Sequence, residues 1–221
     1  MFKGVKAVIF DIDGTLMDSI SRIVECIRMA CESCKVQVPT PQESKNIIGL
    51  TLTEAIRQLF SDLSEEKIAE VVEAYKKIYT DYEDREPTAL FDDSLTTIKK
   101  LREHGIKIGI ATGKSRKGYN RVVNYANLKD LVDVSCTGDE VRSKPDSQML
   151  RVLSDELQIP VQACVMVGDS LLDLDMATNA HVLGVGVTTG VHSREVLEKA
   201  NPVCIVDSLT ELADLIIKDI K

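Results

Sequence analysis

The sequence predicts an α/β fold in which a parallel sheet is interrupted, after its first strand, by a block of helices. Short apolar runs at 7–10, 106–111 and 163–167 end at polar residues or Gly, as strands buried on both faces of a parallel sheet do. From about residue 91 onward these runs alternate with helical periodicity, which implies crossovers between parallel strands. No strand-like run interrupts the helical periodicity of residues 18–83, so we interpret that block as an insertion.

The inserted block is predicted to contain amphipathic helices. The first covers about 20–31, with apolar residues at i, i+3 and i+4 behind a cap at Asp18 or Ser19. A second begins with the capping box Thr51-x-x-Glu54, and a third covers about 68–82. Because each has an apolar face, we expect them to pack together as a small bundle.

The remaining elements are predicted to complete a Rossmann-like parallel sheet. Helices are expected at about 94–105, 148–157 and 170–179 and after the capping box Ser208-x-x-Glu211; further strands are expected at 131–134, 183–187 and 204–206. Residues 1–17 and 84–221 would then form the core domain, and residues 18–83 a separate all-helical domain.

Composition excludes several classes of protein. The 221 residues carry a formal net charge of −8, which argues against nucleic acid binding, since phosphate backbones require clustered Lys and Arg. No apolar stretch approaches the ~20 residues that a membrane span needs, and the N-terminus leads directly into the first strand. The pair Cys31-x-x-Cys34 has no second Cys pair nearby, so we expect free thiols and a cytoplasmic protein.

The first predicted strand ends in two aspartates, Asp11 and Asp13. At the carboxyl end of a buried parallel strand they occupy the edge of the sheet where such folds bind ligands. Two carboxylates about 4 Å apart repel by roughly 4 kcal/mol at an effective dielectric near 20. A simple turn at Asp13-Gly14 is the alternative, but a turn alone does not explain why two carboxylates that repel each other stand there.

Three other segments place polar residues at strand or helix ends. Thr112-Gly113-Lys114-Ser115 follows the 106–111 strand; it is not a P-loop, since Ile108 stands where Gly is required, but a Thr hydroxyl and backbone N–H groups can bind one phosphate. Lys144-Pro145 precedes a predicted helix and would place Pro in its first turn. In Gly168-Asp169-Ser170-x-x-Asp173, a helix beginning near Ser170 would put Asp169 and Asp173 on one face.

Carboxylates from two strand ends, a hydroxyl from a third and a lysine suit phosphoryl transfer, which depends on positioning and charge stabilisation. Several carboxylate ligands with room for water and substrate phosphate suit Mg²⁺. A small phosphorylated metabolite is therefore the expected partner.

These segments, in this order, resemble the motifs of the haloacid dehalogenase superfamily over essentially the whole chain. Asp11-x-Asp13-Gly14-Thr15-Leu16-x-Asp18-Ser19 resembles its first motif, Thr112 its second, Lys144-Pro145 its third and Gly168-Asp169-Ser170-x-x-Asp173 its fourth. The inserted helices are similar to the cap domain of the branch that contains phosphoglycolate phosphatase and β-phosphoglucomutase.

The resemblance implies a role for each matching residue. Asp11 would attack phosphorus, and Asp13 would protonate the leaving oxygen and then activate water. The Asp11 carboxylate, the Asp13 carbonyl and Asp169 would hold Mg²⁺, with Asp173 in support. Thr112, Gly113 and Lys144 would bind the phosphoryl oxygens.

Within the cap, Asn46–Thr51 is similar to the loop that reaches the substrate in this family. Gly49 in this loop, together with Lys45 and Arg57, is our candidate for substrate selection. The expected function is a Mg²⁺-dependent phosphatase of the phosphoglycolate phosphatase type. Alternatives are a phosphomutase of the β-phosphoglucomutase type, a pyrophosphatase and, outside enzymes, a phospho-acceptor or regulatory module.

Overall fold

The computed structural model describes residues 1–220, and its core is a six-stranded parallel sheet. The strands are β1 (Ala7–Phe10), β2 (Lys107–Thr112), β3 (Val134–Thr137), β4 (Cys164–Gly168), β5 (Leu183–Val187) and β6 (Cys204–Val206), in the spatial order β3-β2-β1-β4-β5-β6. From β1 the chain first adds strands on one side and then on the other, since β1 pairs with β2 on one side and with β4 on the other. In such sheets the ligand site lies at the carboxyl ends of the strands beside this reversal.

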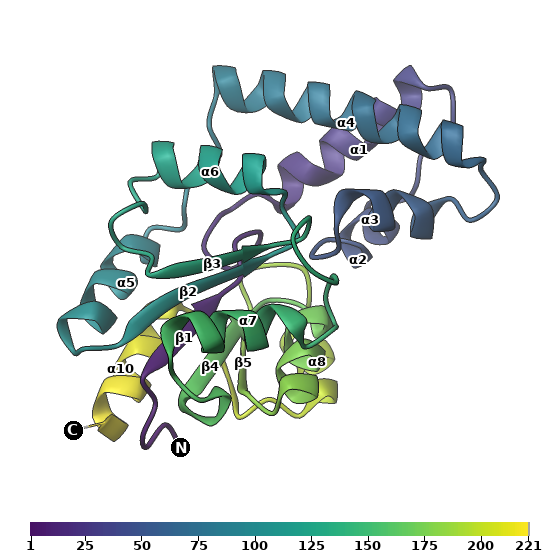
Figure 1. Cartoon of the computed structure of the whole chain (residues 1–221). Helices are drawn as coiled ribbons and strands as arrows, with labels where there is room; N and C mark the ends of the chain where they lie inside the picture. Colours follow the sequence, from purple (N-terminus) through teal and green to yellow (C-terminus); the bar gives the residue numbers. More distant parts are fainter. Residues whose placement is uncertain (221) are drawn as a thin grey trace.

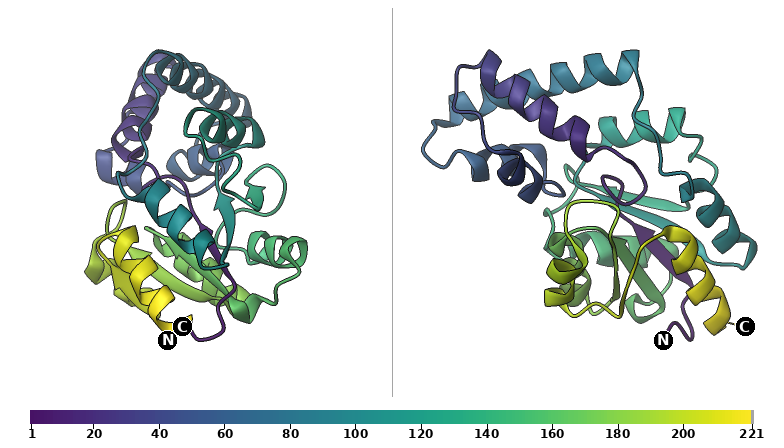
Figure 2. Two further views of the ribbon diagram at one scale, coloured as in Figure 1. Left: turned by 90° about the vertical axis from the view of Figure 1, so that its left-hand side faces the viewer. Right: turned by 180° about the vertical axis from the view of Figure 1, so that it is seen from behind.

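Helices cover both faces of the sheet (Figures 1 and 2). One face packs against α5 (Ser94–Glu103), α6 (Arg116–Tyr125) and α10 (Leu209–Ile220), and the other against α7 (Gln148–Leu157) and α8 (Leu171–Ala180). Successive strand residues alternate between the faces: Val8 and Phe10 belong to the first core cluster, and Ala7 and Ile9 to the second. The short helix α9 (Arg194–Leu197) and two 3₁₀ turns, η1 (Val161–Ala163) and η2 (Glu198–Ala200), complete the core.

The segment between β1 and α5 forms a separate group of helices beyond the strand ends (Figure 1). It comprises α1 (Ile20–Ser33), α2 (Pro41–Asn46), α3 (Leu52–Leu59) and α4 (Glu65–Arg85). Its own apolar cluster centres on the buried residues Ile27, Ile56 and Val71. The chain leaves and re-enters the core side by side, because Asp18 N donates to Ala89 O and Phe91 N to Leu16 O. We call α1–α4 the helical unit.

The predicted α/β fold with a parallel sheet is confirmed, but two local predictions were wrong. The third strand is 134–137 rather than 131–134, because Leu131 N and Val132 N both donate to Leu128 O in a turn and not to a neighbouring strand. Pro145 is not in a helix's first turn: α7 begins at Gln148, and the Lys144–Pro145 peptide is cis. Helix α6 was not predicted.

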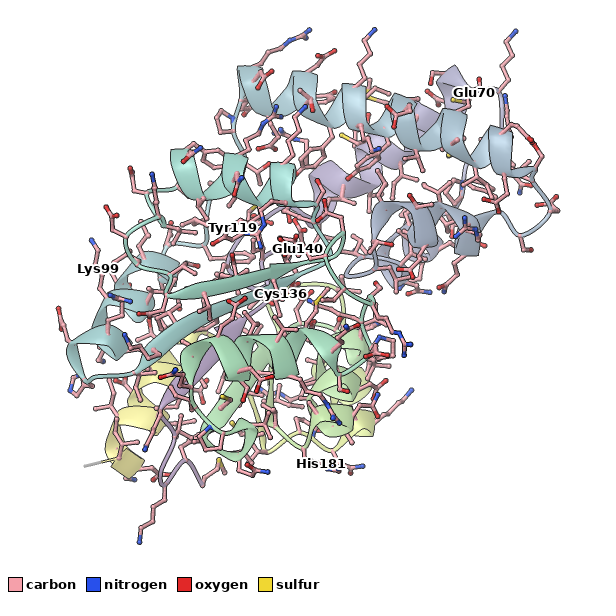
Figure 3. The ribbon with its side chains drawn as sticks, viewed as in Figure 1. Glu70, Lys99, Tyr119, Cys136, Glu140 and His181 are labelled. Atoms are coloured by element: carbon pink, nitrogen blue, oxygen red, sulfur yellow. The ribbon has the colours of Figure 1, made fainter. Side chains whose placement is uncertain are left out.

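The six cysteines are free thiols, and most of them are buried. Cys136 lies on β3 (Figure 3), where burial raises the pKa of its thiol to about 11. Cys31 and Cys34 belong to the apolar cluster of the helical unit. Among residues 1–220, no helix has the length and apolar character that crossing a membrane would require.

Candidate active site

Polar residues from three adjacent strands meet at the carboxyl edge of the sheet. Phe10 is in register with Ile110 of β2 and Val167 of β4, so the ends of these strands lie side by side. Asp11 follows β1, Thr112 ends β2 and Asp169 follows β4. The structure thus assembles residues more than 150 positions apart into one buried site.

The turn after Asp11 packs closely against Asp169. Gly14 has φ +79°, and a Cβ there would lie 2.4 Å from Asp169 Oδ2, so only Gly fits. Thr15 donates its hydroxyl hydrogen bond to Asp169 Oδ1 at 3.0 Å, and Val191 N donates to Asp169 Oδ2 at 2.7 Å. The turn therefore positions Asp169 next to the first strand.

Three buried carboxylates lie together, and two of them pair with one buried ammonium group. Asp11, Asp169 and Asp173 each present an oxygen within 4.8 Å of the others, and all three are buried. Lys144 Nζ lies 2.7 Å from Asp11 Oδ1 and 2.7 Å from Asp173 Oδ1. The second oxygen of Asp173 accepts hydrogen bonds from Ser170 N and Oγ at the start of α8.

This arrangement has more negative charge than its own cation can balance. Burial, with repulsion from Asp173 and Asp13, raises the pKa of Asp11 to about 7 despite the neighbouring Lys144. Burial, with repulsion from Asp173 and Asp11, raises the pKa of Asp169 well above its usual range. Burial alone would lower the pKa of Lys144, but Asp11 and Asp173 outweigh it and keep Lys144 charged.

The carboxylate cluster fits a divalent cation. Asp11 Oδ1 is buried and, although close to Lys144 Nζ, lies outside hydrogen-bond geometry with any partner. A buried carboxylate oxygen of this kind needs a charged or hydrogen-bonding partner. A second positive charge bound by Asp11 and Asp169 would compensate the excess negative charge. Asp173, with both oxygens engaged, instead holds Lys144 in place.

Asp13 lies beside this cluster and is held through one oxygen. Its Oδ1 accepts a hydrogen bond from Ser19 Oγ at 2.6 Å and pairs with Lys114 Nζ at 2.8 Å. Lys114 also donates to the hydroxyl of Tyr79, from α4 of the helical unit, at 3.3 Å. Lys114 therefore links Asp13 in the core to the helical unit.

The roles of Ser19 and Lys114 were missed in the sequence. Ser19 does occupy the N-cap position of α1, but its hydroxyl makes no capping hydrogen bond because it bonds Asp13 instead. Lys114 was noted only within a segment that is not a P-loop. Its place two residues after the end of β2, at the same sheet edge as Asp13, was the available signal.

The segment Ile48–Thr51 of the helical unit lies directly on the core. Thr51 N donates to Ser143 Oγ at 3.1 Å. A Cβ on Gly113 would lie 2.5 Å from Leu50 O and 2.6 Å from Gly49 O. The backbone of the helical unit therefore lies directly against Gly113 in the loop after β2.

A cleft of about 610 Å³ lies between the helical unit and the core, with Asp13, Gly113 and Lys114 in its lining. Of the three residues predicted to select substrate, Gly49 lines this cleft, and Lys45 and Arg57 are not among its lining residues. Arg57 is exposed and pairs with Glu65 at 2.7 Å. In this structure Arg57 thus contacts its own helical unit.

Replacing Gly113 by Ala should impair the seating of the helical unit on the core. The new methyl group would contact two backbone carbonyl oxygens, which cannot turn aside as a flexible side chain would. We expect KM to rise by about tenfold or more, since that displacement is worth ~1–3 kcal/mol. Steady-state kinetics test this, with Gly118→Ala as the control, because a Cβ there meets nothing closer than 3.6 Å. Equal KM values for the two variants would contradict the expectation.

In the metal-free protein, stability should fall as pH rises from about 4 to about 7. The folded protein keeps Asp11 protonated up to its raised pKa of about 7, whereas the unfolded chain releases that proton near 3.8. The folded state therefore binds more protons within this window, and its advantage is lost as pH passes the folded pKa. Thermal melts of wild type and Asp11→Asn measure the effect, since Asn does not titrate. A Tm that falls equally in both proteins would show that Asp11 is not responsible.

Comparison with known proteins finds one matching family and relatives that are similar over nearly the whole chain. A model of the family described as "Haloacid dehalogenase-like hydrolase" matches residues 8–187. The chain is 26% identical over 220 residues to a phosphoglycolate phosphatase of Vibrio parahaemolyticus, with 96% of each chain covered. It is 24% identical over 213 residues to the pyrophosphatase PpaX of Bacillus cereus, again with 96% of each covered.

The fold is also found in solved structures. A hydrolase from Pseudomonas syringae superposes with a TM-score of 0.87 at 20% sequence identity, covering 98% of this chain and 100% of that one. The similarity extends over both the sheet and the helical unit.

Proposed function

The chain belongs to the haloacid dehalogenase-like hydrolases, and on that basis we propose that it is a Mg²⁺-dependent phosphatase that forms an aspartyl-phosphate on Asp11. Its substrate would be a small phosphorylated metabolite. One observation supports this most strongly: three buried carboxylates lie together at the carboxyl edge of the sheet, and the buried lysine beside them pairs with only two of them, Asp11 and Asp173. A purely structural cluster of this composition would be costly, because buried charges without sufficient partners destabilise a fold.

Asp11, the main-chain carbonyl of Asp13 and Asp169 would hold Mg²⁺, whose charge would stabilise the phosphoryl oxygens as negative charge develops on them. Lys144 is already charged and would face the same oxygens. The Thr112 hydroxyl and the backbone N–H of Gly113 would bind them from the end of β2. Asp169 and Lys144 are already held by buried contacts, Asp169 by Thr15 and Val191 and Lys144 by Asp173, and preorganised charges contribute most to rate acceleration.

The reaction would take place in two displacements. The Asp11 carboxylate attacks phosphorus; the bond to the leaving oxygen breaks, and Asp13 gives that oxygen its proton. Asp13 then takes a proton from water, whose oxygen attacks phosphorus and breaks the bond to Asp11, releasing phosphate. Ser19 and Lys114 hold Oδ1 of Asp13, and this fixes its carboxylate beside the cleft.

We also propose that residues 18–83 act as a cap over this site, with Gly49 in the loop that approaches the substrate. The placement of Gly49 and Leu50 carbonyls against Gly113 supports this role. A cap that covers the site excludes water from the reacting groups and selects among substrates.

Phosphate release in the presence of Mg²⁺ tests the proposal. Purified protein is assayed against p-nitrophenyl phosphate and a panel of phosphoglycolate, sugar phosphates, nucleotides and pyrophosphate. We expect steady, multiple-turnover release that stops with EDTA and returns with Mg²⁺. Phosphorylation that ends after one equivalent would favour a phospho-acceptor module, and no Mg²⁺-dependent release from any member of the panel would refute a phosphatase.

A further inference from the structure

The wall of the cleft between the helical unit and the core is largely apolar. Its lining includes side chains of α1, α3, α4 and the segment between α2 and α3, among them Ile23, Ile27, Ile47, Ile48, Leu50 and Leu52. Tyr75 and Tyr79 of α4 also line it, and their rings are stacked with centroids 5.6 Å apart. Because Asp13 lies in the same lining, a leaving group bound next to Asp13 would contact this wall.

The charges that line the cleft are balanced. The acidic residues are Asp13, Glu73, Glu83 and Asp139, and the basic residues are Lys76, Lys114, Lys117 and Arg121. Opposite charges therefore occur in equal number, and the cleft has no excess of cations for a second anionic group on a substrate.

Most of the basic side chains are also already paired. Lys114 is 2.8 Å from Asp13, Lys76 is 2.7 Å from Glu73, and Arg121 is 3.6 Å from Asp84. Lys117 is exposed to solvent. Apart from Lys117 at the solvent side, a carboxylate or a second phosphate entering the cleft would meet a cation only by breaking one of these pairs, and would otherwise lose its hydration without a partner.

On the basis of the proposed phosphatase activity, we infer that the preferred substrate is a phosphomonoester whose leaving group is uncharged and carries an apolar or aromatic portion. The apolar wall would bind that portion, and the charged groups of the catalytic cluster would contact only the phosphoryl end. Size supports this inference: 610 Å³ lies within the ~300–1,000 Å³ typical of pockets for drug-sized ligands. Phosphoglycolate and pyrophosphate are much smaller and are charged at both ends.

Two matched pairs of substrates test the inference. Phosphoglycolate is compared with 2-hydroxyethyl phosphate, which replaces the carboxylate by a neutral CH₂OH, and pyrophosphate is compared with phenyl phosphate. In each pair we expect kcat/KM to be at least about tenfold higher for the ester whose leaving group carries no carboxylate or second phosphate. Tenfold is the scale of discrimination that one pocket contact provides. A wild-type preference for phosphoglycolate or pyrophosphate would overturn the inference while leaving the phosphatase activity established.

A charge-addition variant sharpens the test. Thr53 is an exposed residue of the lining, and Thr53→Lys would place an unpaired cation there. We expect it to raise kcat/KM for phosphoglycolate relative to 2-hydroxyethyl phosphate by several-fold. Thr96→Lys, on the exposed side of α5, is the control and should leave that ratio unchanged. Equal changes in both variants would contradict a role for charge in the cleft, and absence of turnover with every ester would contradict the proposed function itself.

Discussion

Replacing Asp11 by Asn should abolish turnover while leaving the fold intact. Asn has nearly the same shape but cannot form an acyl phosphate, so the two-step reaction loses its first step. Removing the nucleophile of a covalent enzyme costs on the order of 10⁶-fold in kcat, which here means activity at assay background. The change also removes one of the three buried carboxylates, and the metal-free variant should unfold at a higher temperature than wild type at pH above about 7.

The control for this variant is Asp175→Asn. Asp175 lies on α8 close to the site in sequence, but its side chain is exposed. It should retain wild-type kcat and KM, because an exposed carboxylate on the outer face of that helix contacts neither substrate nor cluster. Substantial phosphate release by Asp11→Asn, or equal losses in both variants, would show that Asp11 is not the nucleophile.

Replacing Lys144 by Met should both inactivate and destabilise the protein. Lys144 is 1% exposed and is the ammonium group shared by Asp11 and Asp173. Removing one partner from a buried ion pair costs about 3–5 kcal/mol, because it leaves an uncompensated charge. Removing one charge-stabilising donor from an active site typically lowers kcat by about 10²–10³-fold. Denaturant unfolding and steady-state kinetics measure the two effects separately.

Two further variants identify the cause of that loss. Lys144→Met combined with Asp173→Asn removes one unpaired carboxylate and should recover part of the stability but none of the activity. Lys100→Met breaks an exposed pair with Asp214 and should cost at most ~1 kcal/mol. If Lys144→Met unfolded no more easily than Lys100→Met, Lys144 could not be neutralising the buried carboxylates.

The sheet and the positions of Asp11, Thr112 and Asp169 could be predicted because they depend on local patterns. Buried parallel strands appear in sequence as short apolar runs, and the residue after each run lies at one edge of the sheet. The family pattern adds Lys144, because no local feature of the sequence distinguishes this lysine from a surface lysine. Its burial between Asp11 and Asp173 depends on contacts between residues far apart in the sequence.

Other features depended on contacts that no local pattern reports. Helix α6 has a Gly in its first turn, and only Tyr119, Val122 and Val123 are buried along it, so its apolar face is short. Ser19 has the residue type of a helix cap, and only the fold shows that Asp13 takes its hydroxyl instead. The pairing of Lys114 with Tyr79 joins residues on different elements, and such pairs are set by tertiary packing.

The covalent state of Asp11 during turnover tests the central claim most directly. The Asp13→Asn variant is mixed with p-nitrophenyl phosphate and Mg²⁺ and quenched in acid, and its peptides are analysed by mass spectrometry. This ester has a leaving group that departs without protonation, so the first step should proceed, while water activation by Asp13 is lost and the phosphoenzyme accumulates. We predict a phosphoryl group on the peptide that contains Asp11, absent when Asp11 is also replaced by Asn. Sustained phosphate release by the wild type, with no phosphoryl group on Asp11 in either protein, would contradict the account.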